Sequence, residues 1–305
     1  MKKLLIACGA MLLSLGASAQ AFDPHFGIGA GVGTTGIAID ASATINDYFG
    51  IRAGVDIMPN FKVSKALDLK TENANKQVSQ LTNEINELNT KLIAHGMEPV
   101  DLTKYPGGNL PNKFDVEGKL NNTTGHVLID IHPFKTSFRL TVGAYFGPSE
   151  VVTVYNKEDK FLSPIVAYNN ALINASSQAD VQAVVTKYGL KMIGAELGDY
   201  FLTPNPADKG DVEAYAKVNS FRPYLGLGFG RAVPKGRIGC QFDLGVQFWG
   251  KPEVYVPTYN KTANTYQMEK IEADNAGDDA GKVLKTVSKI SVYPVLNFRL
   301  VGRIF

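Results

Sequence analysis

Apolar residues recur at every second position in eight segments of this 305-residue chain. In residues 138–146, the sequence FRLTVGAYF places Phe, Leu, Val, Ala and Phe at alternate positions, with Arg, Thr, Gly and Tyr between them. Successive side chains of a β-strand point to opposite faces, so this period predicts strands with one apolar face. The eight segments are residues 26–33, 37–45, 49–57, 126–132, 138–146, 221–229, 239–248 and 296–303.

The connections between these segments are short at one end and long at the other. Short turns lie near residues 46–47, 133–136 and 234–236. Bacterial outer-membrane barrels have this arrangement, with their long loops outside the cell. The pattern therefore predicts an all-β fold: an eight-stranded antiparallel up-and-down transmembrane β-barrel with long, partly helical extracellular loops and periplasmic termini. The long connections cover about residues 59–123, 148–218 and 251–288.

The first nineteen residues have the form of a secretory signal peptide. Two lysines at residues 2–3 precede an apolar run over residues 4–15, and small residues end the segment at Ala19. This predicts cleavage after Ala19 and a barrel domain of residues 20–305. The alternative is a lipoprotein signal ending at Cys8, but only about four apolar residues would then precede the cysteine, too few for such a signal.

Charge and cysteine content exclude several classes of protein. Without the signal, 29 basic side chains balance 29 acidic ones, so the chain lacks the basic excess expected of a nucleic-acid binder. Hydrophobic residues make up 45% of the chain, which argues against disorder. Cys240 is the one cysteine that remains, so no intramolecular disulfide is expected. No later run of 18 apolar residues predicts a transmembrane helix.

The residues between the apolar ones indicate which face of the strands meets lipid. They are glycines and charged residues, and all seven arginines of the chain lie in or beside the strands, whereas the long loops use lysine. A soluble barrel would need a lysine- and glutamate-rich exterior, but arginine paired with aspartate suits a confined interior. We therefore expect a barrel-interior charge network. Its expected members are Asp40, Arg52, Asp56, Asp130, Arg139, Arg222, Asp243, Arg299 and Arg303.

With its signal, its eight alternating strands and its terminal Phe305, the chain resembles the small outer-membrane β-barrel proteins of Gram-negative bacteria, of the eight-stranded OmpA-transmembrane-domain type. The resemblance implies that Phe305 is a signal read by the barrel-assembly machinery. The chain departs from the family in one respect, because Arg299 and Arg303 share the phase of the terminal phenylalanine.

The long connections contain helical patterns. In the first, a stripe of apolar residues spaced 3, 4, 3 and 4 apart predicts an amphipathic helix of roughly Ser64 to Ala94. The stripe packs on a neighbouring loop element or forms a coiled-coil seam for a partner. The second connection predicts helices near 165–175 and 179–188, and the third, over 259–285, reads as polar and irregular. The stripe consists of Val78, Leu81, Ile85, Leu88 and Leu92.

Two motifs that suggest chemistry are weak in this context. Residues 31–36 match the dinucleotide fingerprint GxGxxG, but an alternating strand follows where that fingerprint needs a helix. His126, Asp130 and His132 share one strand face, but at about 3.3 Å per residue the two histidines lie about 20 Å apart, too far to share a metal. No cofactor or metal is expected.

These observations favour a non-enzymatic outer-membrane surface protein. Its expected partners are outer-membrane lipid, the barrel-assembly machinery, and an extracellular protein or glycan that the loops bind. If the loops bind no such partner, we expect them to support the cell envelope. Two alternatives remain open. One is a narrow channel for small solutes, although an eight-stranded barrel is filled by its own side chains. The other is a lipid-modifying enzyme using His126 near the outer rim.

Overall fold

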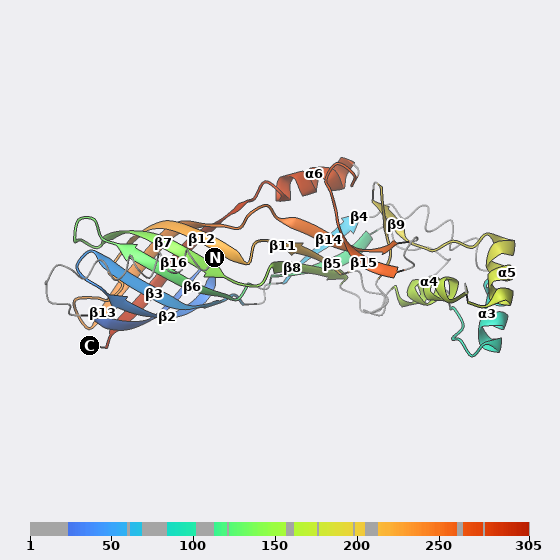
Figure 1. Cartoon of the computed structure of the whole chain (residues 1–305), viewed down its shortest axis with the longest axis horizontal. Coiled ribbons are helices and arrows are strands. Elements are labelled where there is room, and N and C mark those ends of the chain that lie inside the picture. The colour runs from blue at the N-terminus through green and yellow to red at the C-terminus, as the bar shows by residue number, and fades with distance from the viewer. Residues whose placement is uncertain are drawn as a thin grey trace, which may run out of the picture.

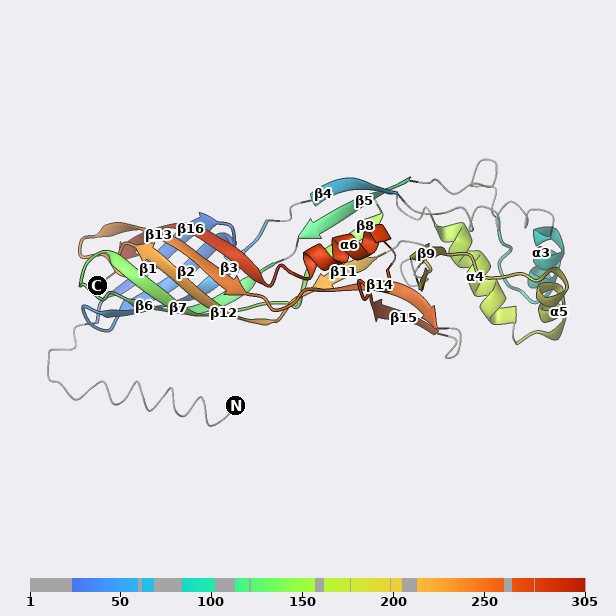
Figure 2. The same cartoon turned by 90° about the horizontal axis from the view of Figure 1, so that it is seen from above.

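The protein is an elongated molecule with a β-barrel at one end, a second β-sheet in the middle and three helices at the far end (Figures 1 and 2). The expected signal peptide, Val78, Leu81 and Phe305 lie outside the residues that the structure describes. This computed structural model describes residues 24–59, 62–68, 84–101, 113–120, 122–156, 162–175, 177–197, 199–204, 213–260, 265–276 and 278–304.

Eight antiparallel strands close the barrel in the order β1-β16-β13-β12-β7-β6-β3-β2, which confirms the predicted fold class. Closure occurs between the first and last strands, where Gly27 pairs with Arg303 and Gly33 pairs with Asn297. Because every strand has two neighbours, the backbone polar groups are satisfied within the sheet, as a lipid environment requires. The strands are β1 (Phe26–Gly33), β2 (Gly36–Thr44), β3 (Phe49–Ile57), β6 (Thr124–Ile131), β7 (Phe138–Phe146), β12 (Phe221–Phe229), β13 (Ile238–Phe248) and β16 (Val292–Arg303).

The apolar phase of the barrel strands faces outward. Leu225 of β12 and Leu244 of β13 are 52% and 54% exposed. Arg222 of β12 and Arg139 of the neighbouring β7 are fully buried. At about 3.3 Å per residue and a tilt of about 40°, the nine residues of β7 span about 23 Å. This is close to the apolar band of about 25 Å that outer-membrane barrels present to lipid.

A second sheet, which the sequence did not reveal, extends from the long-loop end of the barrel. Strands β4, β8 and β14 follow barrel strands in the chain, and β5 and β11 precede them. The sheet pairs in the order β4-β5-β8-β11-β14-β10-β9, with β15 added beside β14. The strands are β4 (Lys62–Asp68), β5 (Lys113–Leu120), β8 (Glu150–Asn156), β9 (Ala195–Leu197), β10 (Tyr200–Leu202), β11 (Ala214–Lys217), β14 (Glu253–Asn260) and β15 (Thr265–Lys270).

The helix prediction for the first connection is too long. Its N-terminal part is wrong, because Lys62–Asp68 forms β4 and Ala66 pairs with Asp115 of β5. Within the described residues the helix there is α3 (Ile85–Ala94), which is followed by Gly96 at a φ of +70°. In Lys62–Asp68, strand pairing therefore prevails over the helical spacing of apolar residues.

The two helices predicted for the second connection are confirmed as α4 (Ser163–Ala175) and α5 (Ala179–Tyr188). The third connection is not irregular, since it contains β15 and α6 (Asp278–Val287). No helix among the described residues is long and apolar enough to cross a membrane.

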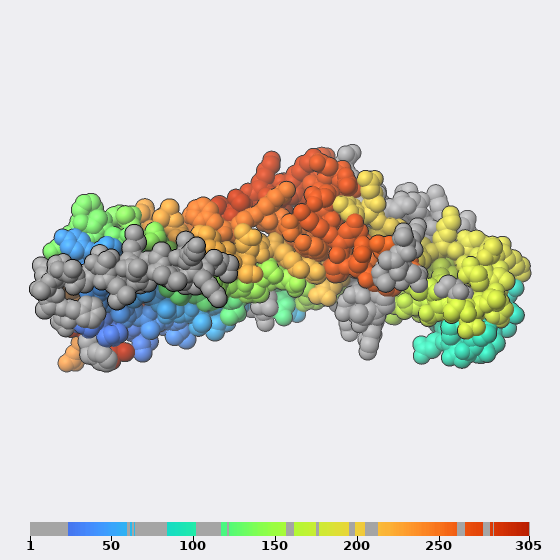
Figure 3. Space-filling model, in the orientation of Figure 1, coloured from blue at the N-terminus to red at the C-terminus, as the bar shows by residue number. Residues whose placement is uncertain are grey.

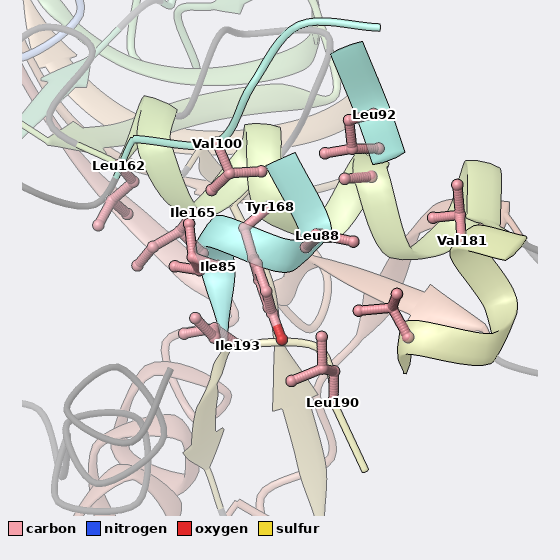
Figure 4. Packing of buried hydrophobic residues seen from close by; sticks show 12 residues of the cluster. Ile85, Leu88, Leu92, Val100, Leu162, Ile165, Tyr168, Val181, Leu190 and Ile193 are labelled. Carbon is pink, nitrogen blue, oxygen red and sulfur yellow. The ribbon is translucent and has the colours of Figure 1, made fainter. Parts of the chain in front are cut away.

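Helices α3, α4 and α5 share a core at the far end of the molecule, which we call the tip module (Figure 4). Ile85, Leu88 and Leu92 of the predicted stripe are buried there against Tyr168 of α4 and Val181 of α5, among others. The apolar face of α3 is therefore covered by neighbouring helices of the same chain.

Two asparagine side chains hold extended segments onto the tip module. Asn89 of α3 accepts from the amide of Val100 at 2.7 Å and donates to its carbonyl at 2.8 Å. Asn169 of α4 makes the same pair of bonds to Ile193, both at 2.8 Å. Each side chain thereby satisfies a backbone amide and a carbonyl, which would be costly to leave unpaired in a buried position.

Helix α6 lies against one face of the second sheet, where the space-filling view shows it beside the strands that follow the barrel (Figure 3). Leu284 of α6 packs on a buried cluster that contains Val256 of β14 and Tyr200 of β10. Helix α6 therefore covers this face of the sheet. The side chains at the alternate positions of each strand point to the opposite face.

The outward apolar face generates a prediction about where the barrel resides. Leu244 lies in the middle of β13, and placing arginine there should destabilise a membrane-embedded barrel by about 2–4 kcal/mol. The measurement is urea unfolding of Leu244→Arg in lipid vesicles. Ile93→Arg, at a 59% exposed position of α3, is the control and should change stability little. Equal, small effects of both substitutions would contradict a lipid-facing barrel.

Candidate functional site

Two arginines and two aspartates form a charged layer across the barrel interior. Arg52 of β3 contacts Asp130 through Nε at 2.8 Å and Asp243 through Nη1 at 3.1 Å. Arg139 of β7 contacts the same two carboxylates, with Nη2 at 2.6 Å from Asp243 and Nε at 3.3 Å from Asp130. All four side chains are at most 5% exposed. Each cation is thus shared between two anions, which offsets the cost of burying charge.

The strand order explains why this layer blocks the lumen. Strands β3 and β13 are four strands apart in the closed order of eight, so the ion pair between Arg52 and Asp243 spans the barrel. Thr141 of β7 adds a hydroxyl donor to Asp130 at 2.7 Å. Arg139 also donates to the backbone oxygens of Phe229 and Gly230, at 3.0 and 2.5 Å. The layer is therefore bonded to both walls and to the backbone.

A second ion pair lies between β16 and β2. Arg299 donates through Nε to Asp40 at 2.5 Å, and its other nitrogens bond to Asp40 and to Gln241. A side chain at Gly29 would overlap the Arg299 guanidinium, since a Cβ there would come within 2.3 Å of Nε. Gly29 on β1 therefore makes room for the arginine.

Asp56 and His126 form a third buried pair nearer the long-loop end. His126 Nδ1 lies 2.5 Å from Asp56, and the hydroxyl of Thr35 donates to the other oxygen of that carboxylate at 2.7 Å. Tyr145 and Tyr224 pack beside the histidine, with ring centroids 5.4 Å from His126 to Tyr145 and 5.5 Å between the tyrosines. These rings fill the lumen above the charged layer.

The two remaining arginines of the expected network do not join it. Arg222 is fully buried near the long-loop end but contacts no carboxylate among the described residues. Arg303 lies at the short-turn end, where it reaches His25 at 3.0 Å and the backbone oxygen of Lys235 at 3.3 Å. Arg222 is fully buried and Arg303 is half-buried, and the alternation in the sequence does not identify the partners of either.

His132 and the glycine motif have structural surroundings. His132 contacts the backbone oxygen of Phe138 at 3.2 Å and lies apart from His126. Residues 31–36 form the hairpin between β1 and β2, and a strand follows them. No group of three or more His, Cys, Asp or Glu side chains within the described part of the chain has the arrangement of a metal site.

A row of tyrosines lies on the face of the second sheet opposite the α6 cluster, and we call it the tyrosine face. Tyr215 of β11 and Tyr255 of β14 pair across the strands and stack, with centroids 5.4 Å apart. Further along β14, Tyr259 packs edge-on against Tyr266 of β15 at 5.1 Å. Tyr155 of β8 completes the row. All five rings are half-buried, so each retains some exposed surface.

Charged side chains of both signs border these rings. The Nζ of Lys217 lies 4.7 Å and 4.8 Å from the ring centroids of Tyr215 and Tyr255, and 3.5 Å from Glu150. Glu253 accepts from Tyr255 at 3.0 Å and pairs with Lys270 at 3.0 Å. Hydrogen bonds from Lys270 and Tyr255 lower the pKa of Glu253, so its carboxylate stays ionised at neutral pH.

A similar cluster borders Tyr155. Its hydroxyl donates to Glu117 at 2.9 Å, and Lys62 pairs with the same carboxylate at 2.6 Å. Bonding to Glu117 raises the pKa of Lys62. The tyrosine face therefore combines aromatic rings with fixed donors and acceptors and has no strong net charge.

The ion pairs between helices of the tip module are exposed. Lys187 of α5 contacts Glu87 of α3 at 2.8 Å, and His95 contacts Asp180 at 2.8 Å. The bond from His95 lowers the pKa of Asp180. Pairs this exposed stabilise a fold by little, so they help align the helices but mark no chemical site.

The closed strand order, the apolar exterior and the charged interior define the class of this protein. The chain is a small β-barrel of the outer-membrane type, with eight strands. It carries in addition a second sheet and a tip module beyond the barrel.

No protein-family model matches the chain, and no curated protein matches it in sequence. Among solved structures, CarO from Acinetobacter baumannii is 13% identical with a TM-score of 0.40, covering 93% of this chain and 99% of that one. CarO2 from Acinetobacter baumannii is 14% identical with a TM-score of 0.39, covering 93% and 100%. A major outer membrane protein from Thermus thermophilus is 13% identical with a TM-score of 0.32, covering 92% and 99%.

Sequence reasoning missed the tyrosine face because its strands were not recognised. A signal was present in residues 253–260, EVYVPTYN, where Tyr255 and Tyr259 alternate with Val254, Val256 and Thr258. Aromatic residues on one phase and aliphatic residues on the other indicate a strand buried on one face and half-exposed on the other.

The charged layer generates a prediction about stability. Arg52→Met leaves Asp130 and Asp243 with one cation between them, and removing one partner of a buried ion pair typically destabilises by about 3–5 kcal/mol. Urea unfolding of the refolded barrel measures this loss. Lys285→Met is the control, because its pair with Asp274 is exposed and such pairs contribute about 0–1 kcal/mol. A similar small effect of both variants would show that the layer does not stabilise the barrel.

Proposed function

We propose that this chain is a non-enzymatic surface protein of the bacterial outer membrane, whose extracellular sheet binds a glycan. The observation that carries this proposal is the tyrosine face, which lies beyond the barrel where an extracellular ligand would meet it. The short-turn end, where β1 begins and β16 ends, would face the periplasm, and the barrel would reach the membrane through the barrel-assembly machinery.

The filled lumen argues against an open channel. Arg52, Arg139 and their two aspartates cross the barrel in one layer, and the Arg299–Asp40 pair occupies the wall between β16 and β2. An eight-stranded barrel is just wide enough to be filled by its side chains. Passage of a solute would require several buried ion pairs to separate, which would be energetically costly.

The arrangement around His126 argues against a rim enzyme. In a nucleophile–histidine–carboxylate site the hydroxyl bonds to the histidine, which takes its proton. Here the hydroxyl of Thr35 donates to Asp56, and His126 contacts the other oxygen of the same carboxylate. The carboxylate thus stands between hydroxyl and histidine, which is not the order that proton transfer requires.

The chemistry of the tyrosine face fits a neutral sugar. The C–H faces of pyranose rings pack on aromatic rings, and their hydroxyls need both donors and acceptors held in place. Tyrosine supplies an apolar ring with a polar end. Lys217, Lys270 and Glu253 supply donors and acceptors beside Tyr215 and Tyr255. The balance of positive and negative side chains favours an uncharged ligand over a strongly anionic one.

The closed lumen predicts that the purified protein forms no stable pore. In planar lipid bilayers we expect no stepwise conductance, because the Arg52–Asp243 pair spans the barrel. A matched test is the double variant Arg52→Ala and Arg139→Ala, which removes the two long side chains of the layer and should raise the frequency of small conductance events. Steady unit conductance of the unaltered protein would support the channel alternative instead.

The tyrosine face predicts glycan binding that depends on its rings. The double variant Tyr215→Ser and Tyr255→Ser should reduce binding to a panel of immobilised neutral oligosaccharides at least tenfold, because it removes the stacked pair. Tyr48→Ser is the matched control, since Tyr48 also carries a lysine over its ring, Lys135 at 4.9 Å, but lies at the short-turn end. Equal binding by all three proteins, or none by any, would refute the proposed ligand class.

A further inference from the structure

A fully buried arginine that contacts no carboxylate of the described residues lies where the barrel meets the second sheet. Arg222 of β12 donates through Nε to the backbone oxygen of Asn219 at 2.8 Å, through Nη1 to the side-chain oxygen of Asn122 at 2.6 Å, and through Nη2 to the backbone oxygen of Pro148 at 2.6 Å. These acceptors are neutral, so they satisfy hydrogen bonds but supply no negative charge. The Trp249 ring, whose centroid lies 5.3 Å from the guanidinium carbon, stabilises the cation through its π face but carries no formal counter-charge. Burying an ion in this way is expensive unless a counter-charge is near.

Three further polar atoms in this part of the barrel are buried and have no hydrogen-bond partner within the described part of the chain. They are Nδ2 of Asn122, Oγ1 of Thr124 and Nε2 of Gln247. The residues that carry them are at most 1% exposed. Buried polar groups are paired in most structures, and an unpaired one points to a position for a ligand or a water. Two of the three atoms are amide nitrogens, which can only donate.

Contacts in the structure place the residues that carry these atoms near Arg222. The Asn122 amide bonds to the guanidinium through its oxygen, so its Nδ2 lies beside the same group. A Cβ at Gly147 would lie 2.6 Å from the Cγ2 methyl of Thr124 and 3.5 Å from Nη1 of Arg222, so the Thr124 side chain lies close to the guanidinium. Gln247 accepts from the indole nitrogen of Trp249 at 3.0 Å, and that indole lies 5.3 Å from the guanidinium carbon of Arg222. We call this group the neck cluster.

The carboxylate of Asp56 makes no direct contact with Arg222. Asp56 pairs with Thr124 across β3 and β6, so it is close to the cluster. Its two oxygens are engaged by Thr35 at 2.7 Å and by His126 at 2.5 Å. The cluster is thus rich in donors and carries a positive charge, while the carboxylate beside it already has two partners.

We propose that the neck cluster binds a small monovalent anion of the halide class, held by Arg222, Asn122, Thr124 and Gln247. A halide accepts several hydrogen bonds at once and supplies the counter-charge that the arginine lacks. The site lies inside the barrel end and uses none of the residues of the tyrosine face, so it stands independently of the proposed glycan ligand.

Trp249 is the one tryptophan of the chain, which makes its fluorescence a direct probe of the neck cluster. Iodide is a heavy-atom quencher and a halide, and Trp249 is only 9% exposed, so collisional quenching from bulk solvent should be small. The full-length protein in detergent is titrated with iodide at constant ionic strength. We expect quenching that saturates in the millimolar range, is reversed by chloride, and is not reproduced by caesium, a cationic heavy-atom quencher.

The test variant is Asn122→Asp, which places a carboxylate where the Asn122 oxygen now accepts from Arg222. It should lower the apparent affinity for iodide at least tenfold, because the arginine then has an internal counter-charge. Asn86→Asp makes the same change on the exposed surface of α3 and should leave the titration unaltered. Because Asn122→Asp adds a favourable ion pair, it should fold at least as well as the unaltered protein, which the heat-dependent gel migration of the barrel checks.

The proposal is overturned if iodide quenching is linear, indifferent to chloride and equal in the unaltered protein and Asn122→Asp. That result would show that the neck cluster holds water alone. The iodide titration does not depend on whether the protein binds a glycan or whether the tyrosine variants lose that binding. The two proposals are therefore tested separately.

Discussion

The closed hydrogen-bonded barrel with a lipid-facing exterior is the constraint on which the rest of the structure depends. Once every second side chain faces lipid, polar side chains of the strands have only the interior to occupy. There they lose water, so each charge needs a partner, and the two arginines and two aspartates of the central layer supply one another. The same layer that makes the interior stable also fills it.

The position of the second sheet follows from the barrel, because several barrel strands continue into it. Strand β7 leads through a short bend into β8, and β13 leads into β14, so the second sheet inherits its position from the barrel. One face of this sheet packs against α6 through Val256 and Leu284, and the other presents the tyrosines. The barrel thus fixes the base of the sheet, and the rings stand at a defined height above it.

Features that follow from the periodicity of apolar residues could be predicted from the sequence. Features that depend on which strands or which charged side chains pair with each other could not. All eight barrel strands follow from alternation, because one phase meets lipid and the other does not. The partner of Arg52 could not be predicted, since Asp243 lies 191 residues away on the opposite wall. The apolar spacing within Lys62–Asp68 continues that of α3 and so predicts helix, and only the pairing with β5 determines that this segment is a strand.

Arg222 shows how position along the barrel changes the balance of forces on a buried charge. Arg52 and Arg139 lie at the level of Asp130 and Asp243, so a charge-neutral layer forms from the strands alone. Arg222 lies where β12 gives way to the bend before the second sheet, and its acceptors there are two backbone oxygens and an amide. Carbonyl dipoles orient the guanidinium but do not cancel its charge. A cation fixed in this way, beside amide donors that find no acceptor among the described residues, favours an anion over a neutral molecule at the junction of barrel and sheet.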